Sequence, residues 1–218
     1  MNKEWSELNK TMQAQIKKKD TYKMGIDTLF NLRRQLMQTL VSFKEDLCRE
    51  DFNAIPFINA DGYHSKTIAY SIWHIFRIED IVAHTVITED EQVFFTGNYQ
   101  VRINSPIITT GNELVKQQIA DFSKQLNLEE LYSYIFEVRE STEKILERFS
   151  YDELKWKIPD ERKGYLKSLN VVNCDEKAIW LIDYWCNKDI CGLIQMPFSR
   201  HWIMHTEACL RIKNKIHS

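Results

Sequence analysis

Residues that interrupt helices are scarce in this sequence. Its 218 residues contain only six glycines and four prolines. Between them, apolar residues recur at steps of three, four or seven, which places them on one face of a helix, whereas a half-buried strand would alternate at every second residue. The sequence therefore favours long helices over many short strands.

Four segments show the helical period most clearly. They cover residues 26–47, 67–86, 131–149 and 198–216. Shorter helices are expected at 112–125 and 176–188, and the turn-rich residues 88–111 are expected to include a short extended piece. The pattern predicts an all-α fold, a four-helix bundle with long crossover connections and short extra helices.

The length and composition suit a single globular domain. With 44% hydrophobic and 28% charged residues, the chain can bury a sizeable core. Residues 1–20 are compatible with a helix but only weakly amphipathic, so they are expected to form an N-terminal extension. Residues 21–218 are then expected to form one helical-bundle domain.

Charge and cysteine content exclude several classes of function. The net charge of −2 gives no basic surface for nucleic acid. The polar N-terminus lacks the apolar core of an export signal, and no apolar run is long enough to cross a bilayer. A cytoplasmic protein with no membrane or nucleic-acid partner is expected. The five cysteines are an odd number without a CxxC pair and are expected to be reduced core thiols.

The histidines show an ordered placement on the predicted helices. His201 and His205, in "RHWIMHTEA", are four positions apart and therefore separated by only about 40° around a helix. They share their face with Ala208 and point toward the bundle interior. His74 lies at the edge of the apolar side of the second helix, whereas His84 groups with charged residues and is expected at the surface.

Three inward-facing imidazoles suggest a metal site. Neutral imidazole binds zinc, nickel, copper or iron, and two histidines one turn apart chelate from a rigid support. Three protein ligands leave one coordination position open for water or substrate, which is the catalytic pattern. The alternative is that each histidine is buried and hydrogen bonded to a carbonyl or carboxylate, and the spacing alone does not decide between the two.

Three further residues are candidates for roles beside the histidines. Arg33 interrupts the apolar stripe of the first helix and either binds a substrate carboxylate or phosphate or, as we prefer, pairs with an acidic residue of a neighbouring helix. Glu79 is a candidate partner for Arg33 or a group that orients a ligand. Tyr70, one turn before His74, either donates to a metal-bound ligand or packs with its hydroxyl satisfied.

The run "SKTIAYSIWHIFRIED" at 65–80, followed far downstream by "HWIMH", resembles the DinB/YfiT-like superfamily of bacterial metalloenzymes. Members are four-helix bundles with a long crossover, with one ligand histidine in the second helix and an HxxxH pair in the last. The resemblance implies that His74, His201 and His205 bind a divalent transition metal, zinc or nickel before iron or manganese. This chain departs from the frequent H-x-G-Q continuation, since it reads "HTEAC".

The resemblance also indicates a function. Activities in the superfamily include thiol-dependent S-transfer and isomerisation, which implies a small-molecule substrate and a low-molecular-weight thiol. A non-catalytic binding or structural bundle is the alternative, and a metal-dependent hydrolase is a further one. The hydrolase would need a general base, and no carboxylate next to the three histidines is an obvious choice. Exposed aromatic faces would also allow a homodimer.

Overall fold

The structure, a computed structural model, describes residues 2–218. All regular secondary structure in these residues is helical, and the only β-type pairing among them is an isolated bridge between Lys157 and Asp189. The predicted all-α class is therefore confirmed. None of the helices in this part of the chain combines the length and apolar character needed to span a membrane.

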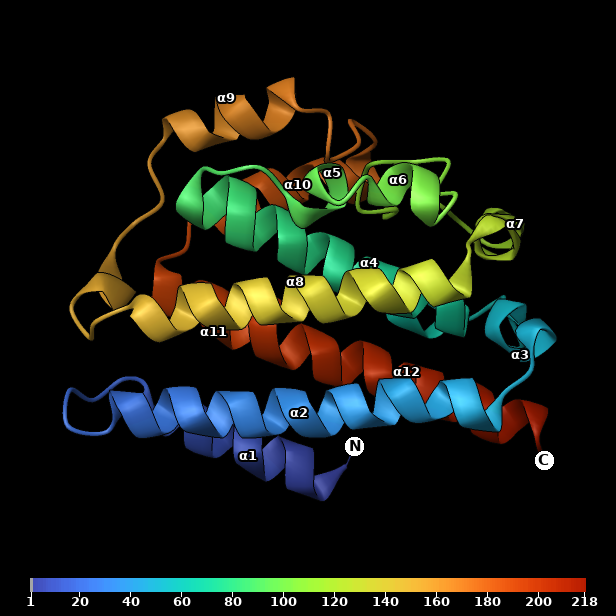
Figure 1. Cartoon of the computed structure of the whole chain (residues 1–218), viewed down its shortest axis with the longest axis horizontal. Coiled ribbons are helices and arrows are strands. Elements are labelled where there is room, and N and C mark those ends of the chain that lie inside the picture. The colour runs from blue at the N-terminus through green and yellow to red at the C-terminus, as the bar shows by residue number, and fades with distance from the viewer. Residues whose placement is uncertain (1) are drawn as a thin grey trace.

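Four long helices occupy the segments with the clearest apolar period. They are α2 (Tyr22–Asp46), α4 (Ile68–Asp80), α8 (Leu128–Arg148) and α12 (His201–Ile216). Both α8 and α12 pack against α2 and against α4, so that α12, at the end of the chain, lies beside two helices of its first half (Figure 1). This packing brings the last helix of the chain against the helix that carries His74.

Eight further α-helices of the described residues connect and cover these four. They are α1 (Lys3–Gln15), α3 (Arg49–Asn53), α5 (Val93–Thr96), α6 (Tyr99–Arg102), α7 (Gln117–Gln125), α9 (Glu161–Ser168), α10 (Glu176–Cys186) and α11 (Ile190–Gln195). Short 3₁₀ turns cover Gly62–His64 and Glu153–Lys155. The expected helices at 112–125 and 176–188 are confirmed as α7, which starts later, and α10.

The expectation of a short extended piece within residues 88–111 is wrong, because this connection contains the helices α5 and α6 and no strand. The carboxylate of Asp80, at the end of α4, accepts hydrogen bonds from the backbone N–H groups of Val93 and Phe94, both at 2.9 Å. These amides have no acceptor within their own first turn, and the buried carboxylate supplies one. A tertiary contact therefore favours a helical turn that local composition did not predict.

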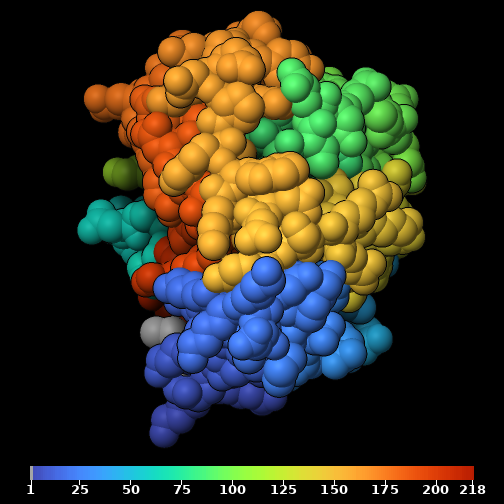
Figure 2. Space-filling view, turned by 90° about the vertical axis from the view of Figure 1, so that its left-hand side faces the viewer, coloured from blue at the N-terminus to red at the C-terminus, as the bar shows by residue number. Residues whose placement is uncertain are grey.

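Helix α1 packs along α2 and contributes to the core. Trp5 and Met12 are buried, and the backbone of Gly25 on α2 passes so close that a Cβ there would lie 2.8 Å from the backbone nitrogen of Ile16. Figure 2 shows the N-terminal segments gathered at one end of the molecule. Residues of the expected extension are thus partly buried against the remaining chain.

Two π-helical segments flank the helices that carry the histidines. Residues 81–88 continue α4, and Met196–Arg200 leads directly into α12. Such segments leave carbonyl groups outside the regular hydrogen-bond pattern and are frequent at functional sites. Here Arg33 donates to the carbonyl of Phe198 at 3.1 Å, which satisfies that carbonyl and fixes the start of α12.

The five cysteines form no disulfide, as expected. Cys186 and Cys209 are buried thiols, Cys191 is partly buried, and Cys48 and Cys174 are exposed. The predicted core location is therefore wrong for Cys48 and Cys174, because both lie in connections between helices and not on apolar helix faces.

Candidate metal centre

Three histidines from two helices converge inside the protein. One ring nitrogen each of His74 on α4 and of His201 and His205 on α12 lies within 4.8 Å of the other two. The ring centroid of His74 is 5.1 Å from that of His201 and 4.8 Å from that of His205. All three side chains are buried, so the predicted inward direction is confirmed and the cluster could hold a metal ion.

The ring of His74 is oriented by the chain. Its Nδ1 lies 2.7 Å from the backbone carbonyl oxygen of Thr110, and because a carbonyl only accepts, Nδ1 carries the proton. The lone pair is then on Nε2, the usual arrangement of a metal-binding histidine. Tyr70 stacks on the same ring with centroids 5.3 Å apart and donates its hydroxyl to the carbonyl of Gly111 at 2.9 Å. Tyr70 therefore packs with a satisfied hydroxyl.

His201 and His205 differ from His74 in their hydrogen bonding. Their Nδ1 atoms are buried and have no hydrogen-bond partner among residues 2–218. Internal satisfaction, the alternative to a metal site, thus describes His74 and not the pair on α12. Three adjacent buried imidazoles, one oriented by a carbonyl and two with an unpartnered ring nitrogen, match the donor set of a transition-metal site.

Burial keeps the three imidazoles neutral. It lowers the pKa of His74 to about 4, against a smaller raising effect of the hydrogen bond to Thr110. Burial also lowers the pKa of His201 and of His205 well below the usual value, and the neighbouring histidines lower both further. The lone pairs are therefore available near neutral pH. No Asp, Glu or Cys of the described residues joins the three within the same distance.

The segment that contacts His74 depends on a glycine. Gly111 has φ +75°, and a Cβ there would lie 3.0 Å from side-chain carbons of Trp73 and of Tyr70. Glycine is the residue that adopts this conformation and allows so close an approach to α4. Thr110 and Gly111 were not predicted as site residues, and the only signal was the short polar run "TTGN" at the end of the turn-rich connection, where the expected helix at 112–125 begins.

Arg33 and Glu79 form a buried ion pair, the pairing preferred from the sequence. Two guanidinium nitrogens of Arg33 lie 2.9 and 2.7 Å from the two carboxylate oxygens of Glu79. Glu79 also accepts from Nε1 of Trp202 at 2.7 Å, and Arg33 stacks over the Trp202 ring at 4.3 Å. The cluster joins α2, α4 and α12 beside His201. Neither charged side chain lines the cavities described below.

The predicted surface position of His84 is wrong. Its side chain is buried, with Nδ1 2.7 Å from a carboxylate oxygen of Asp90 and Nε2 3.0 Å from the hydroxyl of Ser141. Asp90 lies beyond the π-helical end of α4, and Ser141 belongs to α8. Polar groups of two other segments thus cover the charged face on which His84 was placed.

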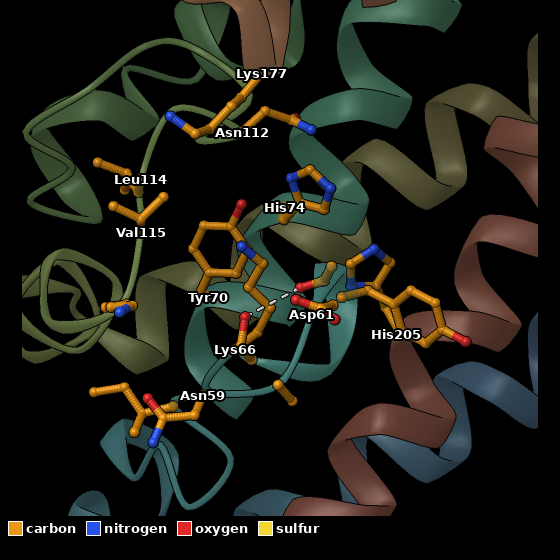
Figure 3. A pocket seen from close by; sticks show the side chains of 16 residues that line it. Asn59, Asp61, Lys66, Tyr70, His74, Asn112, Leu114, Val115, Lys177 and His205 are labelled. Atoms are coloured by element: carbon orange, nitrogen blue, oxygen red, sulfur yellow. Dashed lines mark hydrogen bonds between the residues drawn. The ribbon is translucent and has the colours of Figure 1, made fainter.

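Two cavities open onto the histidines. The polar cavity, about 630 Å³, is bordered by residues 58–63, 65–66, 112 and 114–116 and by Lys177 (Figure 3). The aromatic cavity, about 250 Å³, is bordered mainly by α10 and the start of α12. His74, His205 and Asn112 line both cavities, and the buried Oδ1 of Asn112 has no hydrogen-bond partner in residues 2–218. The candidate metal centre therefore lies where the two cavities meet.

Comparison with known proteins gives this chain no family. No family model matches it, and no curated protein matches it. The function is therefore argued from the residues of the site.

Proposed function

We propose that this protein is a divalent-metal-dependent enzyme whose metal is held by His74, His201 and His205. The observation that carries the proposal is the convergence of three buried imidazoles, of which His74 is oriented by a backbone carbonyl while His201 and His205 each have an unpartnered ring nitrogen. Three neutral nitrogens match zinc or nickel better than manganese, which prefers oxygen ligands, and iron is a further candidate. Three protein ligands leave a position open toward the cavities.

We further propose that α2, α4, α8 and α12 form a four-helix bundle of the DinB/YfiT-like type. The packing of α8 and α12 against both α2 and α4 supports this, and so do the long connections on either side of α8. The ligands have the arrangement that the resemblance implies, one histidine on the second long helix and an HxxxH pair on the last. In this interpretation α1 is an addition that covers the outer side of α2.

Within this class, a thiol-dependent reaction such as S-transfer fits the site better than hydrolysis. A divalent ion in the site would lower the pKa of a thiol or a water molecule in the open position. A thiol, with an ordinary pKa of about 8.5, needs little help from a separate base. Tyr70 is a poor base, because its hydroxyl donates to Gly111 and burial raises its pKa. Asp61, the carboxylate in the polar cavity, is exposed and outside the histidine cluster.

Metal analysis of the purified protein tests the proposal. We expect stoichiometric zinc or nickel in the natural protein and its loss in His201→Ala and His205→Ala, with His217→Ala as the control because His217 is exposed near the C-terminus. At a free metal concentration of about 100 Kd, binding should stabilise the fold by about 2.7 kcal/mol. Absence of bound metal in the natural protein, or equal content in His201→Ala, would favour a non-catalytic helical protein.

A further inference from the structure

The polar cavity carries an excess of positive charge. Lys66, Lys116 and Lys177 line it, against the single carboxylate of Asp61. Lys177 is partly compensated, since its ammonium lies 3.7 Å from a carboxylate oxygen of Asp175, outside the cavity. Charges of one sign in a recess raise the local concentration of the opposite ion. The cavity therefore favours a negatively charged occupant.

Lys66 is the lysine best placed to bind such an occupant beside the histidines. Its ammonium lies 5.0 Å from the ring centroid of Tyr70, the ring that stacks on His74 (Figure 3). Burial alone lowers its pKa to about 8, and no carboxylate offsets that effect. A partly desolvated cation without an ionic partner is stabilised by an incoming anion.

The aromatic cavity, in contrast to the polar cavity, is lined mainly by apolar side chains. Its walls include Trp180, Tyr184 and Trp185 of α10, together with Met196 and Met204. An apolar cavity of about 150 Å³ holds a benzene-sized group, so about 250 Å³ is room for a substituted aromatic or branched aliphatic group. Trp180 is 49% exposed at this wall, which makes it replaceable at small cost to the core.

We propose that the substrate of this site is an amphipathic organic anion, with its carboxylate or phosphate at Lys66 and its apolar group in the aromatic cavity. The inference rests on the proposed function, because it places the reacting part of the substrate where the cavities meet at His74, Asn112 and His205. Asn112, whose side-chain oxygen lacks a partner, accepts a hydrogen bond from the polar atoms that link the two ends of the substrate.

Calorimetric titration with phenylalkanoates of increasing chain length tests this, with the matching phenylalkanols as neutral probes. Both chelator-treated and metal-loaded protein are used, so that binding at Lys66 is separated from binding of the carboxylate to the metal. The variants are Lys66→Met, Lys66→Arg, Trp180→Ala and, as a distant control, Lys10→Met on the exposed face of α1.

We expect the natural protein to bind the best acid more tightly than its alcohol in both states. Lys66→Met should weaken binding of the acid about tenfold, because the carboxylate loses its hydrogen bond to a charged group, and should leave binding of the alcohol unchanged. Lys66→Arg should retain the preference for the acid. Trp180→Ala should weaken binding of the acid and of the alcohol alike, by about fivefold, because both lose the same aromatic contact. Lys10→Met should change neither.

The inference is overturned if acid and alcohol bind equally, if neither binds, or if Lys66→Met behaves like Lys10→Met. Metal content, measured on the same samples, reports the proposed function independently. Full metal with no preference for the acid rejects the inference alone, whereas Lys66-dependent binding without any metal rejects the proposed enzyme and retains the anion site.

Discussion

Replacement of Arg33 by methionine should destabilise the whole fold. Arg33 is fully buried and donates to both oxygens of Glu79, to the carbonyl of Phe198 and to a carboxylate oxygen of Glu143. Methionine fills much of the volume but supplies no donor. The carboxylate of Glu79 would keep only the hydrogen bond from Trp202 and would remain as an uncompensated buried charge.

The size of the stability loss depends on which member of the Arg33–Glu79 ion pair remains buried without its partner. Removing one member of a buried ion pair costs about 3–5 kcal/mol, and for a chain of this length each kcal/mol lowers the melting temperature by about 2–4 °C. Arg33→Met should therefore lower it by about 6–20 °C. Glu79→Gln should cost less, about 1–3 kcal/mol, because Arg33 keeps Glu143 and the carbonyl of Phe198.

Urea unfolding of the chelator-treated protein measures these losses. Arg34→Met is the matched control, because Arg34 is the exposed neighbour of Arg33 on the same helix. The double variant Arg33→Met with Glu79→Met removes both charges and should be more stable than the sum of the two single methionine variants predicts. The reasoning is refuted if Arg33→Met loses no more stability than Arg34→Met, or if the two single losses add.

The remaining predictions concern the histidines and the segment that orients one of them. The folded-state pKa of His74 is about 4 and its ordinary value is 6.5, so the unfolded chain binds the proton first as the pH falls. The metal-free protein should therefore be most stable above pH 6.5 and lose up to about 3 kcal/mol toward pH 4 through His74, with losses of the same sign from His201 and His205, whose pKa values are also lowered, and a urea midpoint that stays constant over this window would contradict the assignment. Gly111→Ala should cost about 1–2 kcal/mol from its positive φ alone and also weaken metal binding, because the carbonyl that holds His74 is displaced. Calorimetric metal titration checks this, with Gly164→Ala as control because nothing lies within 4 Å of a Cβ there; equal metal affinity in the two variants would show that the segment does not orient the ligand.

The long helices and the direction of the three histidines could be predicted because both depend on local periodicity. A residue's angle around a helix is fixed by its position in the sequence, and the apolar stripe shows which face is buried. His201 and His205 were placed correctly for that reason, and so was His74. The same reasoning indicated that Arg33, alone in an apolar stripe, needs an acidic partner.

The other features of the site depend on contacts that periodicity does not describe. Nothing local shows that Thr110 meets His74, that Asn112 lies between two cavities or that Lys66 has no ionic partner. The predicted surface position of His84 was wrong for the same reason, because the groups that cover its ring belong to Asp90 and to α8. The path of a connection depends on the packed helices against which it lies, and a single sequence does not show which helices those are.

The hydrogen-bond pattern around the histidines is unequal, and the inequality is itself an argument for a ligand. Buried charged groups such as Arg33 and Asp80 are bonded repeatedly, and the carbonyl of Phe198 beside the π-helical turn accepts a hydrogen bond, whereas single polar atoms of other buried residues, such as Trp73 Nε1 and Thr142 Oγ1, also lack a partner within the described chain. On α12, two neighbouring imidazoles are left with unpartnered nitrogens. An unsatisfied buried polar group costs about 1–3 kcal/mol, and a metal ion shared with His74 would occupy a nitrogen of each ring and fix its orientation. The hydrogen bonds that Glu79 accepts from Arg33 and Trp202 hold α12 against α4 and so keep the three imidazole rings together.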